Sequence, residues 1–179
     1  NTGFIINNVT ASDAYFIVAE RLQMKDRLNP GTFTLAFSGS STDGTATTLN
    51  LTDNSKTTDA TAAPFGEKYS LQVGSAGVVT DTTEHGFFYP DAGIFVLSAA
   101  QMSSSLPGDP ALITSGSNSH VGFTGTGLAP DLRVADAVDN ARKATLALQK
   151  GSVTLRSEEK QFIYDYFCRA KANEFNYSQ

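Results

Sequence analysis

TFTLAFS, residues 32–38, alternates large apolar side chains with small or hydroxyl-bearing ones along its whole length. In an extended strand Phe33, Leu35 and Phe37 share one face, and the opposite face carries only small side chains. The turn signature Asn29-Pro30-Gly31 precedes the stretch, because Pro fixes φ and Gly tolerates a positive φ. The pattern predicts a strand that buries its apolar face and enters from a tight turn.

Segments on both sides of this strand show related patterns. TATTLNLTD (45–53) follows a turn-rich stretch and places Leu49 and Leu51 in register as a hairpin partner. Further strands are predicted in DAYFIVAERLQ (13–23), which runs into the turn, in EKYSLQV (67–73) and in GIFVLS (93–98). Short neighbouring strands joined by turns indicate antiparallel pairing.

The hydrophobic period changes from two to between three and four after residue 130. Pro130 and Asp131 are helix start signals and Gly151 is a stop signal, with acidic residues early and basic residues late in the segment between them. Residues 131–150 are therefore predicted to be helical. Four small side chains recur on one face of this helix and form a candidate interface with its own sheet or another subunit: Val134, Val138, Ala141 and Thr145.

These elements predict a β-rich α+β fold, with antiparallel strands and one helix near the C-terminus (131–150). We expect a β-rich domain over residues 1–130 that contains a long Gly/Ser-rich loop, 103–130. Residues 131–179 are expected to form the helix and a C-terminal strand that continues into a further segment. Period-four spacing also allows a helix after residue 158, but aromatic and β-branched side chains around 162–167 favour the strand.

Composition excludes several classes of function. The net charge is −5, and the only cluster of basic residues within residues 1–130 is the short group Arg21, Lys25 and Arg27, so no nucleic-acid partner is expected. No stretch reaches the roughly 18 apolar residues of a membrane helix. A single cysteine, Cys168, allows no internal disulfide, and the loop acids lack the spacing of a calcium site. No metal or other cofactor is expected.

Catalytic patterns are also missing. His85 and His120 lie near hydroxyl residues but in no recognised nucleophile turn, and both are interpreted as ordinary loop histidines. Cys168 is interpreted as a small core residue because it lies in a dense aromatic run. Glu84 and Asp91 are separated by a spacing that does not by itself define a pair of glycosidase carboxylates. The chain is predicted not to be an enzyme.

Three consecutive aromatic residues, Phe87, Phe88 and Tyr89, allow two interpretations. They belong to the core, as most such clusters do, or they form a ligand patch on the surface. An exposed aromatic cleft favours binding, whereas buried rings favour a scaffolding role.

Three segments resemble large virion structural proteins of contractile-tailed bacteriophages, including cyanophages. They are MKDRLNPGTFTLAFSG (24–39), GFFYPDAGIFVL (86–97) and RSEEKQFIYDYFCRAKANEFNYSQ (156–179). The resemblance implies a part of the phage tail or baseplate that is assembled in the host cytoplasm. It implies other virion subunits as partners, in a homo- or hetero-oligomeric assembly. Proteins of this kind continue beyond FNYS, so we expect this chain to be a piece of a longer one.

The functional hypothesis is a structural virion protein that connects or decorates tail or baseplate subunits through protein contacts. The main alternative is a receptor- or glycan-binding module of a tail fibre, with the aromatic triplet or the loop 103–130 as its site and a host-surface glycan as its ligand. A third, less favoured, hypothesis is a cell-wall hydrolase that uses Glu84 or Asp91.

Overall fold

The computed structural model of the chain describes residues 4–6, 9–11, 14–40, 45–107, 137–159 and 161–169. Within these ranges the structure is β-rich and has three helices. In chain order the elements are β1 (Phe4–Ile6), β2 (Val9–Ala11), β3 (Ala14–Val18), α1 (Arg21–Met24), β4 (Arg27–Leu28), β5 (Thr34–Ser40), β6 (Ala46–Asp53), β7 (Thr61–Ala63), β8 (Gly66–Ser75), β9 (Val78–Tyr89), β10 (Ile94–Ser98), α2 (Ala99–Ser105), α3 (Ala137–Lys150), β11 (Ser152–Thr154) and β12 (Ser157–Glu158).

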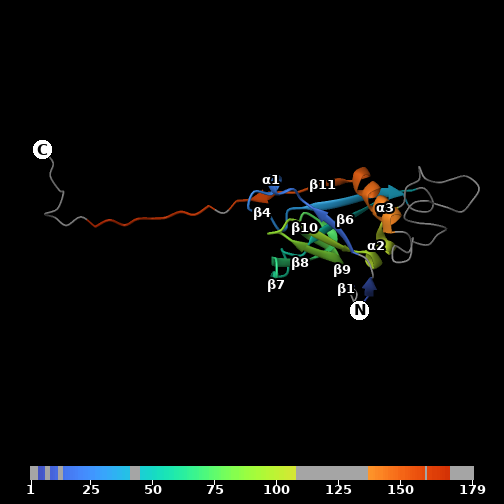
Figure 1. The fold of residues 1–179 in the computed structure, drawn as a ribbon, viewed down its shortest axis with the longest axis horizontal. Helices are drawn as coiled ribbons and strands as arrows, with labels where there is room; N and C mark the ends of the chain where they lie inside the picture. Colours follow the sequence, from blue (N-terminus) through green and yellow to red (C-terminus); the bar gives the residue numbers. More distant parts are fainter. Residues whose placement is uncertain are drawn as a thin grey trace, which may run out of the picture.

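The main sheet is antiparallel and curls into a half-barrel. Its strand order is β11-β5-β6-β8-β9-β10-β3, and β7 pairs with β8 beside this path. Figure 1 shows the curled strands with α3 on one side. The pairs β1-β2 and β4-β12 form two small separate sheets. This architecture confirms the predicted fold class, a β-rich α+β fold with antiparallel strands and a helix towards the C-terminus.

The predicted strand lies at the centre of the core. Phe33, Leu35 and Phe37 are each almost completely buried, as their shared face predicts. The ring of Phe33 lies 4.7 Å from that of Phe88 and 5.0 Å from that of Phe95, both in edge contacts. Phe88 and Phe95 stack on each other at 4.8 Å. Phe33 lies directly before β5, which starts and ends two residues later than the predicted strand 32–38, and the aromatic cluster joins the start of β5 to the other half of the curled sheet.

The predicted hairpin is also confirmed. β5 and β6 pair with Leu35 opposite Leu51 and Phe37 opposite Leu49, so all four side chains point into the core. A one-residue change of register would turn every one of them towards the opposite face.

The curl of the sheet arises where β8 and β9 pair. Their register shifts repeatedly between Leu71 and Gly74, and such bulges bend a strand and increase its twist. On the other side of β9, Gly86 lies opposite Leu97 of β10. A Cβ at Gly86 would overlap the carbonyl of Val96, so only glycine permits the two strands to approach this closely.

Buried polar groups hold the turn before β5. Asp53 is fully buried, and its two carboxylate oxygens accept the backbone N–H of Gly31 at 3.0 and 2.8 Å. Gly31 has a φ of 74°, which a side chain would strain. The hydroxyl of Thr52 donates to the carbonyl of Phe33 at 2.8 Å and accepts the N–H of Gly77 at 2.7 Å. Two neighbouring residues of β6 thus fix two distant turns.

The helix predicted over 131–150 is present as α3, Ala137–Lys150. Residues 131–136 lie outside the described residues. α3 packs against β5 through Ala147, which is fully buried, and through the half-buried Ala144 and Leu148. The predicted loop 103–130 begins differently, because residues 103–105 complete α2, where the Ser98 hydroxyl accepts the N–H of Gln101. Residues 108–130 lie outside the described residues.

The two predicted strands at the chain ends are each shorter than expected. Of residues 13–23 only Ala14–Val18 forms a strand, and Arg21–Met24 forms one helical turn. Of residues 153–179, short segments pair as β11 with β5 and as β12 with β4. Residues 161–169 form neither strand nor helix, because no described strand lies beside them and an isolated short helix is marginal in water.

Candidate functional site

The C-terminal arm, residues 161–169, has the densest group of exposed large apolar side chains among the residues that the structure describes. It runs away from the sheet as a single extended segment (Figure 1), and all nine of its side chains are exposed. Five of them are large and apolar and are between 75% and 97% exposed: Phe162, Ile163, Tyr164, Tyr166 and Phe167. Exposed apolar groups at this density are typical of interaction surfaces.

Cys168 lies in the same arm and is exposed. It is therefore not the small core residue that its aromatic surroundings predict. The rings beside it are themselves outside the core, so the composition of the segment was a misleading guide to burial.

A small sheet and a set of ion pairs attach the arm to the folded domain. β12 pairs with β4, so that Glu158 lies opposite Arg27. The Arg27 guanidinium contacts three carboxylates: Glu67 at 3.0 Å, Asp91 at 3.5 Å and Glu158. Lys25 forms a further, more exposed pair with Glu159 at 3.1 Å. The arm therefore starts from a fixed point.

The Arg27 side chain is only 14% exposed. Burial by itself lowers the pKa of Arg27, but the surrounding carboxylates, Glu67 first and then Glu158, raise it overall. The guanidinium therefore stays charged and bridges Glu67 of the main sheet to Glu158 at the base of the arm.

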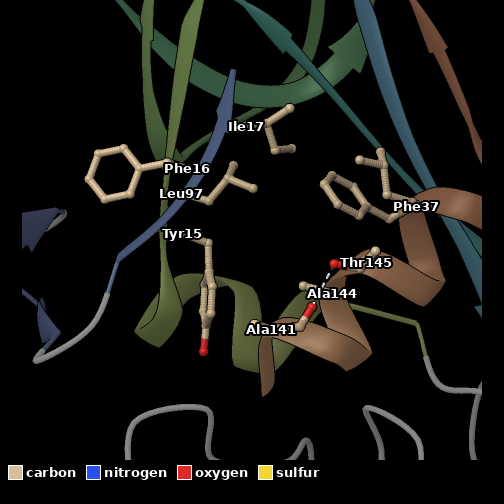
Figure 2. A pocket seen from close by; sticks show the side chains of 9 residues that line it. Tyr15, Phe16, Ile17, Phe37, Leu97, Ala141, Ala144 and Thr145 are labelled. Carbon is tan, nitrogen blue, oxygen red and sulfur yellow. Dashed lines mark hydrogen bonds between the residues drawn. The ribbon is translucent and has the colours of Figure 1, made fainter. Parts of the chain in front are cut away.

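A second candidate surface lies where the half-barrel is open. A pocket of about 120 Å³ separates β3 from α3, and we call it the seam pocket. It is lined by Tyr15, Phe16, Ile17, Phe37, Leu97, Ala141, Ala144, Thr145 and Leu148. Figure 2 shows Ile17 of β3 and Phe37 facing each other across the pocket, with Phe16 on the opposite side of β3. The lining is mainly apolar, so the seam pocket suits an apolar side chain.

The predicted α3 interface lies at the edge of this pocket. Ala141 and Thr145 are exposed and line it, and the Thr145 hydroxyl donates to the carbonyl of Ala141 at 2.8 Å (Figure 2). Contact with the protein's own sheet is made instead by the neighbouring face around Ala147. Val134 and the side chain of Val138 lie outside the described part of the structure.

The structure separates the aromatic triplet. Phe88 is fully buried in the core, so it cannot contact a ligand. Phe87 and Tyr89 are half-buried on the other face of β9. The ammonium group of Lys68 lies 4.2 Å from the centre of the Phe87 ring, and Tyr89 contacts the exposed ring of Phe65.

Phe87 also contributes to a polar hollow of about 390 Å³ beside β8 and β9. Lys68, Ser70 and Glu84 share its wall with residues of the 54–61 loop. The Ser70 hydroxyl donates to Glu84 at 2.6 Å, whereas Asp91 belongs to the Arg27 cluster. The structure therefore places Glu84 and Asp91 in two different sites.

His85 is buried in β9 and is not a loop residue. Its Nδ1 lies 3.0 Å from the carbonyl of Thr83 and its Nε2 lies 3.0 Å from the hydroxyl of Ser105. Burial lowers the pKa of His85, and this outweighs the hydrogen bond to Thr83, which raises it. A buried histidine that bridges β9 to α2 serves the fold. His120 lies outside the described residues.

Among the described residues, no three His, Cys, Asp or Glu side chains are grouped so that they could hold a metal ion. None of the described helices is long and apolar enough to cross a membrane.

The sequence did not indicate the Arg27 cluster, because its members come from four segments that are brought together only by the fold. The signal that was present is the acidic pair Glu158-Glu159, which lies two residues before an aromatic run. Comparison with protein families, with curated proteins and with solved structures finds no match to this chain.

Proposed function

We propose that this chain is a structural virion protein of a contractile-tailed phage and connects or decorates tail or baseplate subunits through protein contacts. The proposal places the protein in the phage tail, assembled in the host cytoplasm. The observation that carries it is the C-terminal arm, which presents five large apolar side chains outside the folded domain. The resemblance of three segments to phage tail proteins supports the same assignment.

The attachment of the arm supports a role in assembly. Arg27, which is largely buried, fixes its base to the main sheet, so the arm starts in a defined direction. A pre-oriented apolar segment loses less conformational entropy on binding than a free tail. Catalysis has no comparable support, because Glu84 and Asp91 lie in two different sites and His85 is buried between β9 and α2.

The proposal is tested on purified particles of a phage that encodes the chain. Tryptic peptides 28–56 and 144–150 should be found by mass spectrometry in the particle band of a density gradient. A phage replication enzyme from the same lysate is the control and should stay in the soluble fraction. Peptides of this chain that occur only in the soluble fraction would contradict the proposal.

A separate experiment tests the prediction that the chain is not an enzyme. We expect incubation with peptidoglycan, capsular polysaccharide or ester substrates to yield products at the level of a buffer blank. Turnover that is lost in Glu84→Gln or Asp91→Asn would restore the hydrolase hypothesis.

The polar hollow beside Phe87 favours glycan binding as a second candidate function. It combines an aromatic ring with the carboxylate of Glu84 and the amide of Asn54, which are groups that bind sugar hydroxyls and sugar faces. Calorimetric titration with host-surface polysaccharide tests it. Binding that is lost in Phe87→Ala and kept in the matched variant Phe65→Ala would support this function, and absence of binding would remove it.

A further inference from the structure

We infer that the C-terminal arm of one copy binds the outer edge of β3 in a second copy as an added strand. This inference deepens the proposed function and rests on its claim that the chain acts through protein contacts. It assigns both halves of one interface to the same chain, so that copies join head to tail.

The arm has the properties of a strand that lacks a sheet. Its side chains alternate, so Phe162, Tyr164 and Tyr166 share one face, and Ile163 and Phe167 lie on the other. Large apolar side chains thus occur on both faces, as in strands that are covered on two sides, and Asp165 lies between Ile163 and Phe167 on the second face. Its four aromatic side chains could together bury about 600–1,000 Å² of surface. This area is comparable to the roughly 800 Å² that each partner buries in a standard interface.

β3 offers a matching edge. It is the last strand of the sheet, pairs with β10 on one side, and has no described strand on the other. Phe16 and Val18 are exposed on one face of β3, and Ile17 borders the seam pocket on the other. Both faces of this edge are therefore apolar, and both faces of the arm carry large apolar side chains. An added strand would cover Phe16 and Val18 and place side chains over the seam pocket.

The lengths are compatible. At a rise of about 3.3 Å per residue, nine arm residues span about 30 Å and the five residues of β3 about 17 Å. The arm is long enough to pair with the whole of β3 and to continue past its end.

The direction of the arm favours binding to β3 of a second copy over binding to β3 of the same chain. β12 and the Lys25–Glu159 pair hold the chain up to residue 159, and the arm then points away from the domain (Figure 1). A return to the chain's own β3 requires a reversal directly after Glu159. The sequence Glu158-Glu159-Lys160-Gln161 contains no Gly, Pro, Asn or Asp, the residues that make tight turns.

A head-to-tail contact leaves one free arm and one free edge on every dimer, so further copies can add. Light scattering after size-exclusion chromatography of the full chain tests this. We expect a mass above that of the monomer which increases with concentration. Phe16→Lys places a charge on the β3 edge. The double variant with Phe162→Asp and Tyr166→Asp places two charges on the arm. Each should require a concentration at least about tenfold higher to associate.

Mixing the two variants is the decisive experiment. One retains an intact arm and the other an intact edge, so an equimolar mixture should form a heterodimer and no larger species. The control is Phe65→Lys, because Phe65 is 67% exposed and Phe16 is 65% exposed, and it should associate like the unmodified chain. A mixture that remains monomeric, or a control that loses association equally, would overturn the inference.

Cross-linking gives a second readout that does not depend on the charge substitutions. Cys168 is the single cysteine of the chain and lies in the arm. Oxidation of Val18→Cys should produce trimers and larger ladders through bonds between residues 18 and 168, whereas bonds between two Cys168 side chains stop at dimers. The matched variant Phe65→Cys should give only dimers. Cross-linked ladders of equal extent in the two variants, or no ladder in either, would contradict the inference.

Failure of this inference is distinguishable from failure of the proposed function. A chain that is found in phage particles but is monomeric at all concentrations would overturn only the arm-to-edge contact. A chain that self-associates but is absent from particles would overturn only the virion role.

Discussion

The Arg27 guanidinium contacts the Glu158 carboxylate across paired strands and, through the same side chain, the Glu67 carboxylate of the main sheet. The base of the arm is thus tied to β8 by one largely buried cation. Its removal leaves three carboxylates close together with no charge to balance them.

Arg27→Met is accordingly expected to lower the free energy of unfolding by about 1–3 kcal/mol, because the carboxylates are partly exposed and water screens part of their repulsion. Urea unfolding measures this effect. Hydrogen exchange should also accelerate at Asn29, whose N–H bonds to the carbonyl of Arg156. Lys25→Gln is the control, since its pair with Glu159 is exposed, and a loss as large as that of Arg27→Met would contradict the role of the buried cation.

Asp53→Ala is expected to destabilise the protein by about 1–3 kcal/mol, because it leaves the buried N–H of Gly31 without an acceptor. The midpoint of urea unfolding should fall while the slope stays constant. Asp59→Ala, at an exposed position of the following loop, should change stability by less than about 0.5 kcal/mol. Equal stability of the two variants would exclude an important role for the Asp53 contact.

Gly86→Ala is expected to cost about 1–3 kcal/mol or more, because its Cβ overlaps the carbonyl of Val96 and forces β9 and β10 apart. The thermal midpoint should fall measurably. Thr82→Ala lies on the exposed part of the same strand and should leave the midpoint almost unchanged. A Gly86→Ala chain as stable as Thr82→Ala would show that the strands can separate at little cost.

The two faces of α3 should respond differently to a bulky residue. Ala147→Trp overpacks the core against β5 and should cost about 1–3 kcal/mol. Ala141→Trp should leave the thermal midpoint nearly unchanged but weaken self-association, because the indole would fill the seam pocket. If Ala141→Trp associates as well as the unmodified chain, this edge of α3 is not part of the interface.

His85 should make stability depend on pH. Because burial lowers its pKa in the folded protein below the ordinary value of 6.5, the unfolded chain binds a proton more readily than the folded one. Stability is therefore complete above pH 6.5 and decreases as the pH falls from there through the folded pKa. Thermal midpoints across this range test the prediction, and His85→Gln should reduce the dependence. An unchanged pH profile in His85→Gln would contradict it.

Local periodicity was sufficient for the central hairpin and for most of α3. Phe33, Leu35 and Phe37 alternate strictly, and only one register buries them together with Leu49 and Leu51. The same reasoning failed at positions where the environment comes from distant segments. His85 is buried where α2 brings Ser105 to it, and Phe88 is buried because Phe33 and Phe95 of other segments pack against its ring.

The arm shows the limit of composition as a guide. Aromatic and β-branched residues favour a strand, but a strand needs a neighbour to pair with its backbone. Among the described residues no neighbour lies beside 161–169, so the propensity of Phe162 to Phe167 remains unsatisfied. The β-propensity of the segment therefore indicated that it is suited to form a strand, but it did not indicate whether a pairing strand lies beside it.

The strand order also sets a sequence of events during synthesis. β5, β6, β8, β9 and β10 are consecutive neighbours that pair through short connections, whereas β3 pairs with β10 across a much longer stretch of chain. Such non-local pairing is slow, but it requires no residue after Ser98. Because chains are made from the N-terminus, β3 and its partner β10 of a nascent copy have both been translated before that copy's own arm. If copies join as inferred above, the first arm to meet a new edge would belong to an older molecule, and a growing assembly would have a direction in time.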